Sequence, residues 1–121
     1  MTNSVHLDGV ATGQEIGPLL KTPTNVSMFM YSAVVWLVHR IHYDYQFATE
    51  HEELPDVVVH GTLATDWYAQ LVHEWAGPGA RLARLSYQIR GYMLPDQTLS
   101  CGGTVAGVRD MIEEHSVDLR L

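Results

Sequence analysis

The most constraining feature of the sequence is a helical stretch near its middle with a wide apolar face. Large apolar residues recur there at every fourth position: Leu63, Trp67, Leu71 and Trp75. This spacing places them on one side of a helix. Ala64, Tyr68 and Val72 widen the apolar face, and Gly77-Pro78 ends the pattern. A face this wide is typical of a helix that is covered on more than one side.

After this helix the sequence changes to a period of two residues. Apolar and polar residues alternate over Leu82–Leu94, Gln97–Val108 and Met111–Leu121. Alternation of this kind predicts antiparallel strands with one buried face. A shorter strand is expected at Gln14–Leu20. A long helix followed by a run of strands predicts a domain of the α+β class.

Two shorter helices are expected before the central one. Thr24 or Asn25 can cap the first. Its apolar residues share one face, which we interpret as core: Val26, Phe29, Met30, Ala33, Val34 and Leu37. The segment His39–Asp44 breaks this pattern and is expected to be a loop. Asp44 then suits the N-cap of a short helix over Tyr45–His51.

The length and charge of the chain limit its organisation and its partners. With 121 residues, 46% of them hydrophobic and 17% charged, it is expected to be one globular domain over residues 1–121. Residues 1–13 are expected to be loosely ordered. The net charge is -7 and no Lys/Arg cluster follows any face, so we expect neither nucleic acid nor an anionic membrane as a partner.

The single cysteine and the apolar runs give expectations about the compartment. Cys101 excludes an internal disulfide, which favours a reducing, cytoplasmic location. The N-terminal residues lack the apolar core of a signal peptide. The longest apolar run, Val26–Val38, is too short to cross a membrane. Because Cys101 lies in an alternating segment, we interpret it as a buried, inert thiol instead of a nucleophile.

A metal site is the first alternative for the histidines. His39, His42 and His60 could converge in the folded chain. However, the sequence has no His-Glu-x-x-His motif, no cysteine pair and no dense set of carboxylates. We therefore predict no metal site.

Five short motifs within residues 14–107 together identify a family. They are Leu19–Thr24, Phe29–Ala33, His39–Asp44, Phe47–Ala48 and Val57–Gly61. They resemble the MaoC-like family of (R)-specific enoyl-CoA hydratases and 3-hydroxyacyl thioester dehydratases. The nearest branch is that of mesaconyl-CoA hydratases and mitochondrial-type dehydratases.

The resemblance implies a hotdog fold, in which an antiparallel sheet wraps around the central helix. Family members normally continue with another strand beyond the point where this chain stops. Two alternatives follow: the sheet lacks its last strand, or a partner subunit completes it. The resemblance also implies a homodimer, or a heteromer with a second MaoC-like subunit.

The implied reaction is the addition of water to a 2-enoyl-CoA, which gives a 3R-hydroxyacyl-CoA, or the reverse. It needs no cofactor beyond the CoA thioester, which is the substrate. It requires an acid–base group, hydrogen-bond donors to the thioester oxygen and a tunnel for the acyl chain.

Two residues fall on the family's catalytic positions. His42 matches the catalytic histidine, since it stands six residues before Ala48, and an imidazole can exchange protons near neutral pH. Gly61 matches the residue whose backbone N–H binds the oxyanion, and free N–H groups at a helix start suit negative charge. The alternatives are a loop histidine bound by backbone and a glycine required by a tight turn.

Other aromatic residues near these motifs are candidates for substrate binding. They are His60, Tyr31 and Trp36. For Tyr31 and Trp36, packing in the core is the alternative, because aromatic residues on a helix face are usually core.

One position departs from the family pattern. Five residues before the catalytic histidine, the family has aspartate, or asparagine in the nearest branch, whereas this chain has Leu37. Leucine cannot act as an acid, a base or a water ligand. Either His39 supplies the second polar group of the catalytic site, or the working site lies in a partner subunit.

We therefore predict a lyase subunit of the hydratase/dehydratase type. Similarity to heteromeric subunits of steroid side-chain degradation implies a bulky acyl group. The first alternative is a non-catalytic subunit that binds acyl thioester or supports a catalytic partner. A hotdog thioesterase is the second, with Asp66 as the candidate carboxylate on the central helix.

Overall fold

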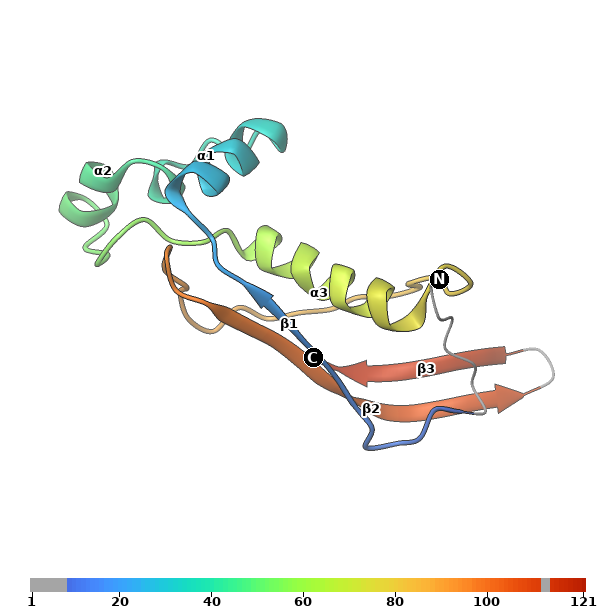
Figure 1. The fold of residues 1–121 in the computed structure, drawn as a ribbon. Helices are drawn as coiled ribbons and strands as arrows, with labels where there is room; N and C mark the ends of the chain where they lie inside the picture. Colours follow the sequence, from blue (N-terminus) through green and yellow to red (C-terminus); the bar gives the residue numbers. More distant parts are fainter. Residues whose placement is uncertain (1–8, 112–113) are drawn as a thin grey trace. The chain divides into compact units, whose positions relative to one another are not determined.

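A computed structural model describes residues 9–111 and 114–121, with the elements labelled in Figure 1. In chain order they are β1 (Glu15–Lys21), α1 (Asn25–Val34), the 3-10 turn η2 (Arg40–His42), α2 (Tyr45–Glu50), α3 (Gly61–Ala76), β2 (Leu99–Met111) and β3 (Glu114–Arg120). Residues 1–13 were expected to be loosely ordered, and residues 1–8 of this segment lie outside the described residues. The contacts divide the chain into two compact units, and the single-domain expectation stays a prediction.

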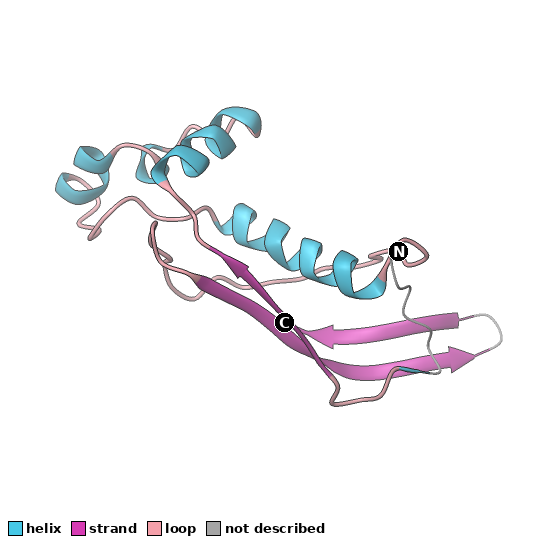
Figure 2. Cartoon of the chain, in the orientation of Figure 1, coloured by secondary structure: helices cyan, strands magenta, loops and turns pink. Residues whose placement is uncertain are grey.

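The first unit contains the sheet and the C-terminal part of α3. The strand order is β1-β2-β3 (Figure 2), and β2 pairs with β3 antiparallel, from Thr104 opposite Arg120 to Met111 opposite Glu114. The core residues of this unit are apolar and buried: Ile16, Trp67, Leu71, Cys101 and Val105. A Cβ on Gly17 would lie 2.8 Å from the Cys101 carbonyl oxygen and 3.3 Å from Leu71 Cδ1. Only glycine therefore permits this approach of β1, β2 and α3.

The strand expected at Leu82–Leu94 is wrong. Within the described residues no strand lies between α3 and β2. Tyr87 and Ile89 in this segment are 57% and 48% exposed. Alternation predicts a strand only where one face is buried and a neighbouring strand supplies the ladder. The strands expected around β1, β2 and β3 are confirmed, with bounds shifted by a few residues.

In the second unit, α1 has the predicted start but buries the opposite face. Thr24 and Ser27 form a capping box, with Thr24 Oγ1 accepting from the Ser27 N–H at 3.1 Å. The residues that α1 buries are Met28 and Ser32. The apolar stripe interpreted as core is wrong, because four of its members are 58–83% exposed: Val26, Phe29, Met30 and Val34. Periodicity does not identify the packed face here, because Met28 gives the opposite face of α1 an apolar residue as well.

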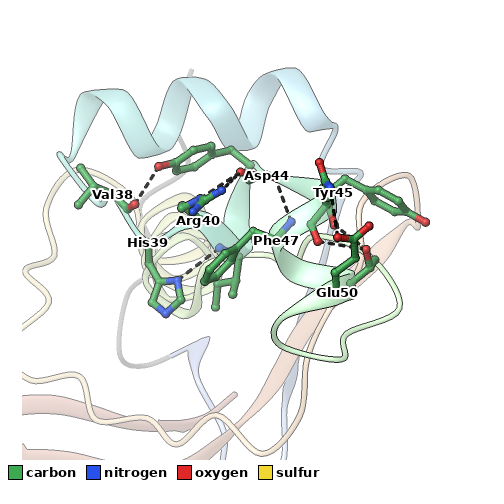
Figure 3. A network of polar contacts seen from close by, with 11 residues as sticks. Val38, His39, Arg40, Asp44, Tyr45, Phe47 and Glu50 are labelled. Carbon is green, nitrogen blue, oxygen red and sulfur yellow. Dashed lines mark hydrogen bonds and ion pairs between the residues drawn. The ribbon is translucent and has the colours of Figure 1, made fainter.

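The segment His39–Asp44 contains one 3-10 turn instead of only a loop. Figure 3 shows the exposed contacts that follow it: Arg40 binds Asp44 Oδ2 at 2.8 Å and 3.0 Å, and Asp44 Oδ1 accepts from the Phe47 N–H at 3.1 Å. The Arg40 guanidinium also lies 4.5 Å from the centre of the Phe47 ring. The prediction that Asp44 caps α2 is confirmed.

A helix that crosses a bilayer must be long and apolar along most of its length. Over residues 9–111 and 114–121, no helix combines the length and apolar character needed to cross a membrane.

Candidate active site

His42 ends η2 and is 9% exposed, so its ring is almost entirely inside the second unit. Its Nδ1 lies 2.7 Å from the carbonyl oxygen of Val58. A carbonyl oxygen only accepts, so Nδ1 must carry the proton in this bond. The neutral ring therefore has an unprotonated Nε2, which is the form that a general base requires.

The backbone of Val57–Val59 fixes η2 in place. The N–H of Val58 donates to the Ile41 carbonyl at 2.9 Å, and the Val58 carbonyl accepts from His42. Val57, Val58 and Val59 are all buried. The N–H of Val59 donates to the Met93 carbonyl at 2.8 Å. The alternative of a histidine bound by backbone thus holds for Nδ1, but it leaves Nε2 available.

His60 lies beside His42 and is completely buried. Its carbonyl accepts from the Ala64 N–H at 3.1 Å, so His60 stands immediately before the first turn of α3. The two imidazole rings are stacked, with centroids 4.0 Å apart and an interplanar angle of 22°. Nε2 of His60 lies 2.7 Å from Ser32 Oγ. Its Nδ1 is buried and has no hydrogen-bond partner within residues 9–111 and 114–121.

Burial keeps both imidazoles in the neutral form. Burial, with a smaller contribution from the neighbouring His42, lowers the pKa of His60 to about 4. Burial also lowers the pKa of His42; the bond to Val58 opposes this effect, and the charge of His39 adds to it. At neutral pH the site therefore holds two uncharged rings that can exchange protons or hydrogen bonds.

Tyr31 and Asp66 border the pair of histidines. The Tyr31 ring contacts the His60 ring edge to face, with centroids 4.8 Å apart. Its hydroxyl donates to Asp66 Oδ2 at 3.0 Å. Burial raises the pKa of Tyr31, so this hydroxyl remains a donor. Asp66 lies on the exposed side of α3, and its carboxylate is already bound by Tyr31.

His39 is exposed and caps η2. Its Nδ1 accepts from the Ile41 N–H at 3.3 Å, and its ring centroid lies 6.1 Å from that of His42. Nδ1 is thus committed to the turn, whereas the ring itself is close to the candidate base. A catalytic role for His39 stays a prediction.

Gly61 is the first residue of α3, where backbone N–H groups have no acceptor within the helix. A Cβ on Gly61 would lie 3.2 Å from Ile89 Cγ1. No left-handed φ is found at Gly61, in contrast to Gly17 at 90°. The glycine is therefore explained by the close approach of Ile89 instead of a strained turn, and the position suits an oxyanion donor.

The structure brings most of the predicted site residues together. Figure 3 labels His39 close to the turn that carries His42, and Tyr31 and His60 complete the cluster through ring contacts. Trp36 is different, since it is 81% exposed on the segment after α1 and has a positive φ of 56°. Its place in a substrate site stays a prediction.

The sequence interpretation missed Ser32 and the Val58 carbonyl. Ser32 is buried, binds His60 and lies one helical turn after the buried Met28. No signal in the sequence pointed to Ser32, because the apolar periodicity assigned the packed face of α1 to other residues. The Val58 carbonyl could not be found, because a backbone acceptor has no side-chain signature.

A metal centre and the thiol of Cys101 are two other candidate sites. Among the residues that the structure describes, no three His, Cys, Asp or Glu side chains are placed to hold a metal ion. Cys101 is buried in β2, as expected from its alternating neighbourhood.

Comparison with known proteins identifies the family of this chain. The family model of hydroxyacyl-thioester dehydratase type 2 (Htd2) matches residues 14–95, more than half of the chain. No curated protein sequence matches the chain significantly.

Solved structures give the same picture at low sequence identity. A chain of the ChsH1–ChsH2 complex from Mycobacterium tuberculosis has a TM-score of 0.75 at 18% identity, over 83% of this chain and 78% of that one. An (R)-hydratase from A. caviae involved in PHA biosynthesis has a TM-score of 0.77 at 19% identity, over 84% and 76%. A MaoC-like dehydratase has a TM-score of 0.80 at 19% identity, over 98% and 40%. These similarities confirm the predicted α+β hotdog fold.

Proposed function

Because the chain belongs to the hydroxyacyl-thioester dehydratase type 2 family, we propose that it is a lyase subunit that hydrates a 2-enoyl-CoA or dehydrates the 3R-hydroxyacyl-CoA. The observation that carries this proposal is the bond from His42 Nδ1 to the Val58 carbonyl. It leaves Nε2 of a buried, neutral imidazole unprotonated, and this nitrogen can take and return a proton.

In the hydration direction, His42 Nε2 takes one proton from water while the water oxygen bonds to C3 of the enoyl group. The electron pair of the C2=C3 bond moves toward the thioester oxygen. The resulting enolate takes the proton back from His42 at C2, so one water is added and no cofactor is consumed. The Gly61 N–H at the start of α3 donates to the enolate oxygen and stabilises its charge.

The substrate contacts follow from the buried polar atoms. An unpartnered buried nitrogen is costly, so we expect the surroundings of His60 Nδ1 to rearrange when a thioester binds, and this rearrangement would give the nitrogen a partner. The Tyr31 ring lies beside His60, with ring centroids 4.8 Å apart, and would form a wall of the site. Trp36 can contribute only when a ligand or a subunit covers it, because it is exposed.

We also propose that the chain works in an assembly of hotdog subunits, as a homodimer or with a second MaoC-like subunit. Three features support this: the exposed apolar stripe of α1, the segment Leu82–Leu94, which forms no strand in the described part of the chain, and the apolar residue Leu37 at the family's polar position. A structural neighbour is itself part of a complex. The resemblance to steroid side-chain enzymes favours a bulky acyl group, and the cytoplasmic location stays a prediction.

The second candidate function is a supporting subunit that binds acyl thioester without catalysis. Leu37 favours it, because leucine supplies no polar group at the position where the family has a second one. The thioesterase alternative is less supported, since the Asp66 carboxylate is exposed and bound by Tyr31.

The test is hydration of crotonyl-CoA and of a longer enoyl-CoA, followed as loss of the enoyl absorbance. Wild type should be active, His42→Ala should lose about a thousandfold in kcat/KM, and His73→Ala on the exposed side of α3 should not. Full activity of His42→Ala would contradict the assignment of the base. Release of free CoA would instead support the thioesterase.

The assembly is tested by size-exclusion chromatography with light scattering. The obligate-heteromer alternative predicts that the purified chain is inactive or aggregates by itself and becomes active with its partner. A stable, active homodimer would exclude that alternative and leave the homodimer.

A further inference from the structure

We infer that Ser32 and His60 form a positioning pair, which fixes the His42 ring through a buried hydrogen bond and a ring stack. The inference rests on the proposed function only for its kinetic consequences. Its structural content concerns three side chains from three parts of the second unit: Ser32 from α1, His42 from η2 and His60 from the start of α3.

The first link is the hydrogen bond between Ser32 and His60. Ser32 Oγ and His60 Nε2 are 2.7 Å apart, and both residues are buried. A flip of the imidazole would break this bond and leave the nitrogen without a partner in a region from which water is excluded, which is costly. Ser32 therefore determines the orientation of the His60 ring.

The second link is the stack of His60 on His42. The interplanar angle of 22° and the separation of 4.0 Å mean that one ring face lies against the other. The Val58 carbonyl binds His42 at its edge, through Nδ1. With one restraint on the edge and one on the face, the His42 ring cannot rotate without displacing His60.

The pair also supplies polarity that the position of Leu37 lacks. Ser32 stands five residues before Leu37, and the Leu37 N–H donates to the Ser32 carbonyl at 2.9 Å. The Leu37 side chain has no polar atom. A second polar group therefore reaches the neighbourhood of His42 by another route, from Ser32 through the imidazole of His60.

The electrostatic surroundings make the pair sensitive to water. The titratable groups near it are His39 beside His42, Tyr31 against His60, Asp66 bound to Tyr31, and Tyr87, which interacts with Tyr31. Burial is the main cause that lowers the pKa of His42. If His60 loses its anchor, water gains access to His42, and this effect becomes weaker.

The test compares Ser32→Ala with Ser27→Ala, a serine on the same helix that belongs to the capping box and does not contact His60. In Ser32→Ala, NMR of the His42 imidazole should show a mixture of tautomers and titration at a higher pH than in wild type. The acidic limb of kcat/KM should move upward with it, and kcat/KM should fall about tenfold. Ser27→Ala should keep the wild-type tautomer and titration.

Two further variants keep the inference testable. Ser32→Thr retains a hydroxyl and should restore the tautomer, whereas Ser32→Cys fills the same space with a weaker hydrogen-bonding group and should shift it as alanine does. A wild-type tautomer and titration of His42 in Ser32→Cys and Ser32→Ala would overturn the inference. If wild type hydrates no enoyl-CoA, the proposed function fails, but the NMR comparison still decides the positioning pair.

Discussion

The two sides of the motif His39–Asp44 differ in what they do. On the exposed side, Arg40 and Asp44 form an ion pair and Asp44 caps α2 (Figure 3). On the buried side, His42 is neutral, bound by the Val58 carbonyl and stacked on His60. Adjacent residues of one short motif thus separate into a charged part that defines the turn and an uncharged part that is suited to proton transfer.

The difference follows from solvent access. Exposed charges interact weakly because water screens them, so the Arg40–Asp44 pair stabilises local geometry instead of a reaction. A buried imidazole loses its charged form, because burial penalises charge. The motif therefore places a neutral imidazole next to a polar surface turn, and variants on the two sides should affect different properties.

Among variants that leave His42 unchanged, the largest loss of kcat/KM is expected at Gly61, next to the buried His60. In Gly61→Ala the new Cβ would lie 3.2 Å from Ile89 Cγ1, so either the Ile89 side chain or the start of α3 must give by a few tenths of an ångström. If the start of α3 shifts, the displacement of the proposed oxyanion donor should lower kcat/KM about a hundredfold. Alanine favours the helix more than glycine does, so lower helix propensity would not explain the loss.

The double variant Gly61→Ala/Ile89→Ala provides the matched control, measured against Ile89→Ala alone. Ile89 is partly exposed, and its truncation makes space for the new methyl group. Most of the activity should return in the double variant. Equal loss with and without Ile89 would show that the contact is not the cause.

Much of this arrangement could be predicted from the sequence, for identifiable reasons. The Asp44 cap and the start of α3 depend on residue type and spacing, which are local, whereas the catalytic role of His42 stays a prediction. The packed face of α1 depends on which neighbours cover it. The structure buries Met28 and Ser32 instead of the longer apolar stripe that begins at Val26. The prediction of a strand at Leu82–Leu94 was wrong because an alternating segment forms a strand only beside a partner strand. The sequence does not show whether such a partner is present.

An intermediate effect, on thermal stability instead of kcat/KM, is expected on the exposed side, at Asp44. The Phe47 N–H and Arg40 hold the pKa of Asp44 below its usual value. The charge of Asp44 therefore stabilises the fold at pH values above the unfolded pKa, and this contribution is lost as the pH falls through the folded pKa. Asp44→Ala should lower the melting temperature by a few degrees at pH 7, and Asp44→Asn, which can still cap, should lower it less.

Thermal unfolding between pH 7 and pH 3 measures this difference. The gap between wild type and Asp44→Asn should narrow toward acidic pH, because the wild-type carboxylate becomes protonated. The titration of His42 and the kcat/KM of both variants should stay near wild type. A large loss of activity at constant stability would mean that the exposed side takes part in catalysis.

The smallest loss of kcat/KM is expected at Tyr31, which contacts both a buried and an exposed residue. Its ring contacts the buried His60, whereas its hydroxyl binds the exposed carboxylate of Asp66. Tyr31→Phe keeps the ring and removes the hydroxyl. Because one partly exposed hydrogen bond contributes little net free energy, kcat/KM should change about threefold or less. Tyr31→Leu, which removes the ring as well, should change it more. If Tyr31→Phe instead abolishes turnover, the hydrogen bond between Tyr31 and Asp66 takes part in the reaction. The charged carboxylate of Asp66 on α3 would then belong to the catalytic site, together with the neutral His42–His60 stack.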